Sequence, residues 1–385
     1  MGTLAFAQPE TFEQAARSLA ECSREGRSVR ICGAGTKPWT SPARDGELPL
    51  RTGGLNRILA HDPGDMTATL EAGVPLHEAQ ARFATEDQML ALDPPAGGPE
   101  NGSACPATIG GIVATGDCGP LAHRYGGPRD LVVGMTVALA DGTIARSGGT
   151  VIKNVAGYDI AKLFCGGFGT LGLILSINVR LHPQLPTVSA TGEASDVAAL
   201  CAAARELAAM PAELDCLDLA WSAGGGRLLA RCAGPQAPAR AQRVAEAMAC
   251  AGLDATATEP EDEPLWEQQR AAQRSSTAAV LRVAAQPSLL PAVMTAVDSV
   301  QGSVVARAAL GHAYVTVDPE RVGSLREQLP AGAVSVLRDC PASAREQIAE
   351  PWDTAPAGAL GLMRALKARF DPTGTCNPGT FVGGI

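Results

Sequence analysis

Closely spaced cysteine pairs are missing from this sequence, and their absence argues against the commonest protein metal sites. The chain has 11 cysteines in 385 residues, but no C-x-x-C pattern. Structural zinc sites and iron–sulfur clusters usually draw their ligands from such pairs. The cysteine count is also odd, so a complete set of disulfides is impossible. We therefore expect free thiols that are mostly buried, and no metal site.

Long apolar runs and positive charge are also lacking. No run of 18 apolar residues occurs, and residues 1–14 have neither the basic nor the apolar segment of a signal peptide. These absences predict a cytoplasmic protein without a transmembrane segment. The formal net charge of −9 and the sequence pI near 5.2 argue against binding to nucleic acid or to an anionic membrane surface.

What the chain does have is enough apolar sequence for two domains. Hydrophobic residues make up 46% of the chain and charged residues only 18%. This composition is that of an ordinary globular protein and not of a disordered one. Because 385 residues exceed the usual size of a single hydrophobic core, we expect two domains.

Residues 151–183 combine a polar segment, a glycine-rich turn and a strand. Lys153, Asn154, Tyr158 and Asp159 surround Gly157, and four of the seven residues at 166–172 are glycine. Glycines let the backbone approach a ligand closely. The apolar residues 173–181 that follow, Ile174 among them, predict a buried strand. Without a ligand, the same pattern would be a helix, a turn and a core strand.

A second glycine loop lies near the start of the chain, at residues 33–37. It follows a predicted strand at residues 29–32 and offers consecutive N–H groups, a hydroxyl and an ammonium, which suit a phosphate. Pro38 stands where the dinucleotide-binding fingerprint needs its third glycine, and the Walker pattern is absent. A plain turn is the alternative interpretation. The candidate ligand-binding residues are Gly33, Ala34, Gly35, Thr36 and Lys37.

A third glycine-rich segment covers residues 107–119. Its glycines can lie close to a diphosphate or a ribityl chain without steric conflict, and its hydroxyls can donate hydrogen bonds. The candidates are Thr108, Gly110, Gly111, Thr115, Gly116 and Gly119. Residues 132–139 and 143–146 then predict a hairpin around Asp141-Gly142.

In their order and spacing, these three segments resemble the FAD-binding PCMH-type flavoproteins of the vanillyl-alcohol oxidase superfamily. The resemblance implies an α+β protein with a two-subdomain PCMH-type FAD-binding fold and a second α+β cap domain. It also implies that FAD contacts the candidates of all three segments, together with Ile174. Relatives that bind flavin covalently through histidine have it near the first loop, where this chain has none, and Cys105 is one residue away from the cysteine that some relatives use. We therefore expect non-covalent FAD.

Within this superfamily the chain most resembles the smaller FAD-binding subunit of bacterial glycolate oxidase. Catalytic 2-hydroxy-acid dehydrogenases of the superfamily usually have Glu where this chain has Phe168. The resemblance implies a larger catalytic flavoprotein and an iron–sulfur protein as partners, through which the chain could be peripheral to the inner membrane. Two alternatives stay open: an independent FAD dehydrogenase for a small 2-hydroxy acid, and a structural subunit whose flavin pocket is vestigial.

The chain divides, on this interpretation, into an FAD-binding domain at residues 1–186, a cap domain at 187–345 and a C-terminal helix and tail at 346–385. The cap pattern of helix, strand, strand and helix recurs, which suggests a degenerate duplication. Residues 258–264 between the two halves predict a solvated acidic loop. The motif at residues 367–379 resembles the family's terminal motif, in which the tail returns to the FAD domain. For Asn377 in this motif, a structural turn is our first interpretation and a contact with the cofactor is our second.

The sequence leaves the catalytic residues unknown. Oxidation of a 2-hydroxy acid needs a cation for the carboxylate, a base for the hydroxyl proton and the flavin as hydride acceptor. His312 is the only histidine in the cap. Lys153 and Tyr158 are alternatives because they lie near a cofactor segment, although helix packing and a surface charge explain them equally well.

Overall fold

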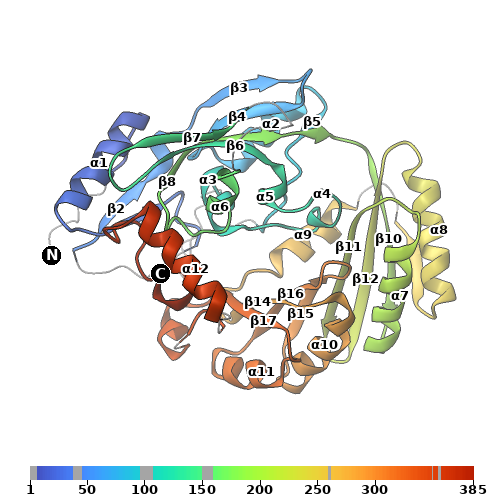
Figure 1. Ribbon diagram of the computed structural model, residues 1–385. Helices are drawn as coiled ribbons and strands as arrows, with labels where there is room; N and C mark the ends of the chain where they lie inside the picture. The colour runs from blue at the N-terminus through green and yellow to red at the C-terminus, as the bar shows by residue number, and fades with distance from the viewer. Residues whose placement is uncertain are drawn as a thin grey trace.

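The computed structural model describes residues 7–37, 46–95, 107–149, 159–258, 262–348, 350–353 and 357–385. Figure 1 shows two parts, with the N-terminal half (blue to green) above and the later residues (yellow to orange) below and to the right. The expected α+β class is confirmed, since helices alternate with antiparallel sheets in both parts. Within the described ranges, no helix has the length and apolar character needed to cross a bilayer.

The N-terminal part is built on a five-stranded sheet of order β3-β4-β8-β6-β7. Its central strand β8 (Leu173–Arg180) is the apolar run predicted from the sequence and pairs antiparallel with both neighbours. The other strands are β3 (Ile58–Asp62), β4 (Thr67–Glu71), β6 (Val132–Ala138) and β7 (Ile144–Gly148). Helices α2 (Leu76–Ala84), α3 (Ile109–Thr115), α4 (Ala122–Tyr125), α5 (Pro128–Leu131) and α6 (Ala161–Phe164) belong to the same part.

A smaller layer precedes this sheet. Helix α1 (Phe12–Arg24) begins at Thr11, whose side chain accepts a hydrogen bond from the Gln14 N–H at 3.2 Å. Strand β1 (Val29–Cys32) pairs parallel with β2 (Leu48–Arg51), and the short β5 (Gln88–Met89) pairs with β9 (His182–Pro183). The apolar face of α1 packs on β1 and β2, and β1 is thereby fixed with its C-terminal end at the first glycine loop.

The second part is an eight-stranded antiparallel sheet, called the cap sheet below, of order β13-β10-β12-β11-β15-β16-β14-β17. Each half follows the pattern strand, helix, strand, strand, helix, strand, and the halves join antiparallel through β11 and β15. The duplication suggested by the sequence is therefore visible in the strand order. The strands are β10 (Thr187–Ala194), β11 (Leu214–Ser222), β12 (Gly225–Ala233), β13 (Asp254–Ala257), β14 (Ala279–Ala284), β15 (Ser303–Arg307), β16 (His312–Val317) and β17 (Val334–Asp339).

One face of the cap sheet carries the main core. It packs against α7 (Val197–Ala209), α8 (Ala237–Cys250), α10 (Leu290–Ser299) and α11 (Val322–Gln328). We call the opposite face the inner face. Because side chains alternate along a strand, Arg282, Arg307, His312 and Tyr314 share this inner face. Figure 1 shows α9 (Glu263–Ala271) between the cap sheet and the N-terminal part.

The prediction of a solvated acidic loop at residues 258–264 is wrong for its described C-terminal part. Asp262 is buried, forms an ion pair with Arg231 at 2.7 Å and directly precedes α9. The helix was missed because its sequence is polar. Trp266 is its one fully buried large apolar side chain among the described residues, and it packs on Cys216 and Leu229 of the inner face, with Leu265 partly buried beside it.

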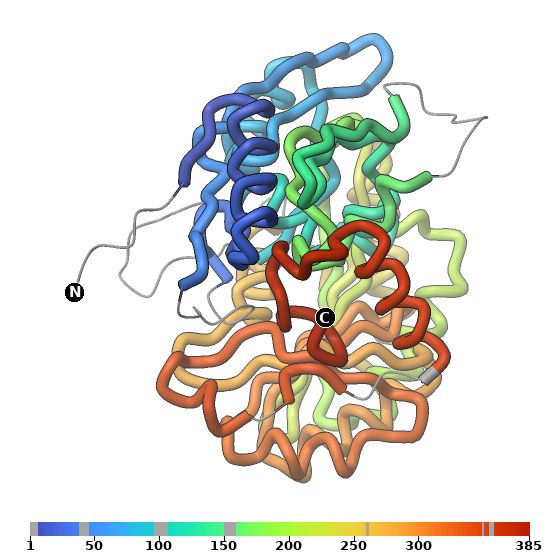
Figure 2. Tube along the Cα trace, turned by 60° about the vertical axis from the view of Figure 1, so that its left-hand side comes forward, coloured from blue at the N-terminus to red at the C-terminus, as the bar shows by residue number. Residues whose placement is uncertain are grey.

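The C-terminal residues return to the N-terminal part, as the terminal motif predicted. After α12 (Ala357–Phe370), the Val29 N–H donates to Thr375 O (2.7 Å), and the Asn377 N–H donates to Val29 O (3.0 Å). Lys367 Nζ donates to Thr170 O at 2.7 Å. Figure 2 shows this red segment crossing between the two parts. The division of the chain at residues 186 and 345 remains our proposal.

Candidate functional site

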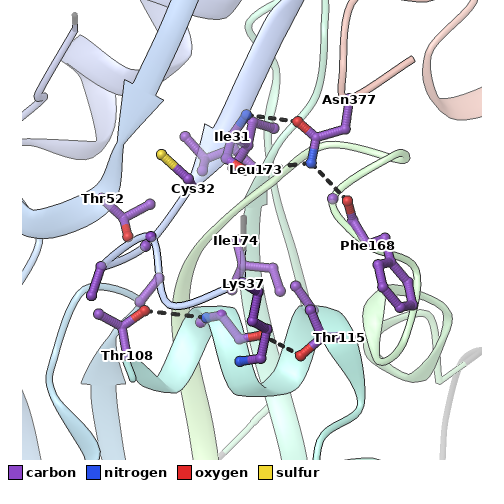
Figure 3. Close-up of a pocket in the computed structure, with 18 of the residues that line it drawn as sticks. Ile31, Cys32, Lys37, Thr52, Thr108, Thr115, Phe168, Leu173, Ile174 and Asn377 are labelled. Carbon is purple, nitrogen blue, oxygen red and sulfur yellow. Dashed lines mark hydrogen bonds between the residues drawn. The ribbon is translucent and has the colours of Figure 1, made fainter. Parts of the chain in front are cut away.

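A cavity between β1, α3, β8 and the C-terminal tail gathers residues from the whole N-terminal part. We call it the central cavity. Its volume, including the open mouth, is about 730 Å³. Figure 3 shows the lining side chains pointing into the space above α3. The lining residues are Ile31, Cys32, Gly33, Ala34, Gly35, Thr36, Lys37, Thr52, Ala72, Thr108, Gly110, Gly111, Ala114, Thr115, Phe168, Gly169, Gly172, Leu173, Ile174 and Asn377.

The first glycine loop lies directly against the N-terminus of α3. A Cβ added to Gly33 would overlap Thr108 Oγ1, so only glycine allows this approach. Gly35 has a φ of +74°, which turns the loop along the cavity wall. The loop therefore brings its backbone, together with the Lys37 side chain, along one side of the cavity.

Helix α3 forms the floor of the central cavity. Thr108 begins the helix, since its side chain accepts from the Gly111 N–H at 3.3 Å. The Thr115 hydroxyl donates to Gly111 O at 2.8 Å, one turn back. Gly110 is needed because a Cβ there would overlap Ala72 on the neighbouring strand end. The helix thus presents its first turn, with small side chains, to the cavity.

The wall opposite the first loop comes from residues 168–174. Phe168 has a φ of +54°, uncommon for a residue with a side chain, and its N–H donates to Ala114 O at 2.8 Å. Its ring packs edge-on against Trp352, with the centroids 5.1 Å apart. Leu173 and Ile174, at the start of β8, complete the wall.

Asn377 connects three pieces of this cavity. Its Oδ1 accepts from the Ile31 N–H (2.6 Å), and its Nδ2 donates to Phe168 O (2.7 Å). Its φ of +41° makes it the turn residue that the sequence predicted. Because it also lines the central cavity, both interpretations of Asn377 agree with its position.

Ten of the twelve residues predicted from sequence lie together in this lining. The exceptions are Gly116 and Gly119. Gly116 ends α3 with a φ of +63°, and Gly119 packs so closely on Asp93 that a Cβ would overlap it. Both positions are explained by chain geometry alone. Cys105, Lys153 and Tyr158 lie outside the described residues.

A buried ion cluster, the Asp117 cluster, lies beside the central cavity. Asp117 Oδ2 pairs with Lys37 Nζ at 3.0 Å and with Arg274 Nη2 at 2.8 Å, and Oδ1 pairs with Arg338 Nη2. Burial alone would raise the pKa of Asp117, but the three cations lower it well below its usual value. Burial lowers the pKa of Lys37, against the effect of Asp117. The cluster joins the first loop to two arginines of the cap.

The inner face of the cap sheet continues from this cluster. Arg338 lies over the Phe168 ring, with its guanidinium carbon 5.6 Å from the ring centroid, and Arg307 lies over Tyr314 at 4.9 Å. Arg307 is fully buried, and its Nη2 donates to Cys118 O at 3.4 Å. Three nitrogens on this face have no hydrogen-bond partner among the described residues: Arg307 Nε, Arg307 Nη1 and Arg282 Nε. Such unpaired buried donors are uncommon and favour an anionic ligand.

The titrating groups on this face are held neutral. Burial raises the pKa of Tyr314 to about 12. Burial, with Arg282 and Arg307 nearby, lowers the pKa of His312 to about 4. At neutral pH the tyrosine is therefore a hydrogen-bond donor. His312 is an uncharged and very weak base, which argues against the role that sequence alone left open for it.

Sequence reasoning missed the cap residues of this site. Each arginine stands inside an apolar strand: AVLRVA for Arg282, SVVAR for Arg307 and VSVLRD for Arg338. A charge in a run of buried residues is the signal that could have found them, because arginine is rarely buried unless it is paired. Within the described residues, no group of His, Cys, Asp or Glu could hold a metal ion.

The central cavity has the chemistry that a flavin dinucleotide needs. Gly33 and Gly110 let the first loop and α3 pack closely around it, because a Cβ would overlap Thr108 at the first position and Ala72 at the second. Backbone N–H groups, the Thr108 and Thr115 hydroxyls and the Lys37 ammonium suit a diphosphate and a ribityl chain. The apolar side chains of Leu173, Ile174 and Phe168 suit an aromatic ring system. The residues present therefore fit FAD.

Comparison with known proteins agrees with this fit. Residues 3–148 match the family "FAD binding domain". The chain is 38% identical over 127 residues to glycolate oxidase subunit GlcE of Escherichia coli, covering 33% of this chain and 35% of that protein. It is 33% identical over 186 residues to glycolate oxidase subunit GlcD of Bacillus subtilis, covering 46% and 37%. The aligned segments thus span about a third of the length of these relatives.

Solved structures share the fold over nearly the whole chain. Chitooligosaccharide oxidase superposes with a TM-score of 0.68 at 15% identity, covering 97% of this chain and 90% of that one. An alkyldihydroxyacetonephosphate synthase gives 0.69 at 14% identity, covering 96% and 76%. At this identity the likeness concerns the fold alone. The two-part arrangement expected from the sequence is confirmed.

Proposed function

Because the chain carries an FAD-binding domain of the PCMH type at residues 3–148, we propose that it is an FAD-dependent oxidoreductase subunit acting in the oxidation of a small 2-hydroxy acid such as glycolate. One observation carries the proposal: three segments far apart in the sequence, and Asn377 from the tail, line one cavity. Relatives named as glycolate oxidase subunits and as a cytochrome-linked D-lactate dehydrogenase support the substrate class.

FAD, when bound, supplies the hydride acceptor of such an oxidation. The chain's own residues bind and orient the dinucleotide: residues 33–37 and the first turn of α3 hold the diphosphate region, and Leu173, Ile174 and Phe168 exclude water from the ring. We expect FAD to be held non-covalently, because relatives that attach flavin through histidine have it near the first loop and this chain has none between Val29 and Pro38.

Arg282 Nε and Arg307 Nη1, which have no hydrogen-bond partner among the described residues, make the inner face the candidate site for a substrate carboxylate. Two guanidinium groups and a protonated tyrosine on one face of the sheet would bind and orient a small carboxylic acid. Since the pKa of His312 is lowered to about 4 by burial, it holds no proton to donate at neutral pH and accepts one poorly.

The lack of an evident base favours a companion subunit over a self-sufficient enzyme. In the proposed complex a larger flavoprotein performs the substrate oxidation, an iron–sulfur protein accepts electrons, and this chain carries a second flavin. It works on the cytoplasmic side, attached to the inner membrane through its partners. The arginines of the inner face favour a second candidate, a dehydrogenase that acts alone, because a carboxylate site has no evident use in a pure electron carrier.

Anaerobic spectroscopy of the purified chain tests both candidates. We expect a yellow protein whose FAD is released by acid precipitation and whose absorbance near 450 nm persists when glycolate or D-lactate is added. Bleaching by either acid would favour the second candidate. A folded protein that binds no added FAD would contradict both, and yellow colour retained in the acid pellet would contradict non-covalent binding.

A further inference from the structure

In the Asp117 cluster, ion pairs connect the cap to the wall of the central cavity. Lys37 belongs to the first glycine loop and lines the cavity, whereas Arg274 and Arg338 belong to the cap and do not line it. Asp117 is 2% exposed, and all three cations reach it. One carboxylate therefore connects a cofactor loop with the cap.

The backbone around Asp117 fixes the carboxylate in place. The left-handed Gly116 ends α3, and the Asp117 N–H donates to Ile112 O at 3.1 Å. Arg338 Nη2 also donates to Thr115 O at 3.0 Å, and Arg274 Nη1 donates to Arg338 O at 3.2 Å. The two arginines are thus bonded to each other, and both form ion pairs with Asp117. Arg338 also bonds the end of α3. Lys37 meets a carboxylate whose position the cap determines.

We propose that Arg274 and Arg338 are positioning residues for the cofactor: acting through Asp117, they hold Lys37 at the cavity wall, so that FAD affinity depends on the cap. A buried ammonium is costly without a fixed partner. If the arginines are removed, Asp117 can turn away or fully neutralise Lys37, and the cavity loses its one charged wall residue among those described. The proposal rests on the proposed binding of FAD.

Linkage makes the coupling reciprocal. If a docked cap favours the Lys37 position that binds FAD, bound FAD favours the docked cap by the same factor. Four side chains from four separate segments carry this coupling: those of Lys37, Asp117, Arg274 and Arg338. It is therefore measurable as an energetic interaction between two of them, Lys37 and Arg274, that have no direct ion pair.

A double-mutant cycle on FAD affinity tests this. The full-length chain, stripped of flavin, is titrated with FAD while the quenching of flavin fluorescence is followed, for the parent, Lys37→Met, Arg274→Met and the double variant. We expect about tenfold weaker binding for each single variant, the loss of roughly one charge-assisted contact. The double variant should bind no more weakly than Lys37→Met, because Arg274 acts through the lysine.

Two further variants separate positioning from simple damage. Arg274→Lys keeps a cation within reach of Asp117 and should recover affinity to within about threefold of the parent. Arg321→Met removes a cap arginine that bonds Val300 O (2.9 Å) and Gln301 Oε1 (2.7 Å), remote from the cluster, and should leave FAD affinity unchanged. If Arg274→Met does not fold, Arg274→Gln, which removes the charge and keeps a polar side chain, closes the same cycle with and without Lys37→Met.

Additive losses in the cycle would overturn the proposal, since they would mean that Arg274 affects FAD independently of Lys37. Unchanged affinity in a folded Arg274→Met protein would overturn it as well. Either result leaves the proposed function standing, because the parent still binds FAD. A parent that binds no FAD would remove the proposed function and this inference together.

Discussion

The central cavity and the inner face of the cap sheet lie next to each other, yet different kinds of groups line them. Backbone, hydroxyls and small side chains line the cavity, and Lys37 is the one charged residue among its described lining. The inner face instead carries the buried charges Arg307 and Asp218 and the half-buried Arg282, with Tyr314 between the two arginines. Phe168 belongs to the first region and touches the second through Arg338.

The difference teaches which property each region contributes. A cavity lined by backbone tolerates little added volume, because its shape depends on glycines with no room for a Cβ. On a face lined by buried charges, the folded state is sensitive to the loss of one charge, because the remaining ion is then buried without a compensating partner. Changes in volume should therefore damage the cavity, and changes in charge should damage the inner face.

The largest effect is expected on the inner face, from Arg307→Met. Arg307 and Asp218 are both 0% exposed and lie opposite each other across the β11–β15 junction, with Arg307 Nε 3.9 Å from Asp218 Oδ2. Removing the cation leaves a buried carboxyl whose remaining described hydrogen bond comes from the neutral Gln269, with Nε2 3.2 Å from Asp218 Oδ2. We expect the free energy of unfolding to fall by about 3 kcal/mol, measured by urea denaturation at pH 7.5.

Adding Asp218→Asn to this variant should recover most of the loss, because the uncompensated charge is then gone. Burial raises the pKa of Asp218 to about 6 even though Arg307 opposes this, so at pH 7.5 the carboxyl is still mostly ionised and its charge needs the arginine. If the double variant is as unstable as Arg307→Met, lost packing and not charge explains the effect, and the contrast between the two regions weakens.

The central cavity should respond to volume, and Gly33→Val is the sharpest case. The new side chain would overlap Thr108 Oγ1 and push the first loop away from α3. We expect FAD binding to weaken at least about 100-fold, equivalent to about 2.7 kcal/mol, in a titration of flavin fluorescence. Thermal unfolding of the apoprotein should change far less, because the loop lies at the edge of the core.

Gly127→Ala provides the matched control in the same domain. Gly127 has a φ of −96°, and an added Cβ would meet no atom within 4 Å. FAD affinity should stay within twofold of the parent. Equal losses in Gly33→Val and Gly127→Ala would show that glycine content in general, and not the contact of the first loop with α3, controls the cavity.

The same contrast explains what could be predicted from the sequence. Gly33 and Gly110 were found because close backbone approach demands glycine there, and Gly35 because its φ of +74° favours glycine, and such demands leave a local pattern. The strand at residues 173–180 was found because its apolar run is continuous. A ligand held by backbone is thus recorded in short motifs, and ten of the twelve candidates met in one cavity.

The inner face left no such pattern. Asp117, Arg274 and Arg338 lie in three segments, and only the folded register brings them together. Helix α9, which places Arg274, was missed because the acidic residues before it suggested a loop. Gly116 and Gly119 lie outside the described lining of the cavity, and the chain's own path already requires both glycines, so their contact with FAD stays a prediction. Local patterns predict backbone geometry, whereas charge clusters depend on topology.

The smallest expected effect concerns Asp93, which lies between the two regions. Its carboxylate oxygens accept the Leu121 N–H at 3.1 and 3.3 Å. Burial raises the pKa of Asp93 from 3.8 to about 7, although Arg270 and Arg307 oppose this. Between these pH values the folded protein keeps a proton that the unfolded chain has released, so stability at this site falls as pH rises. Asp93→Asn removes the titration.

We therefore expect Asp93→Asn to stabilise the protein more at pH 8 than at pH 5, by on the order of 1 kcal/mol, in urea denaturation at both pH values. Asp65→Asn, at an exposed position, makes the same change in net charge and should show no such difference. If both variants respond alike, the pH dependence comes from overall charge. If only Asp93→Asn responds, the stability of the protein depends on the charge of this single buried carboxyl. The N-terminal part, whose cavity is lined mainly by backbone and small side chains, would then share the sensitivity to charge that we expect of the inner face.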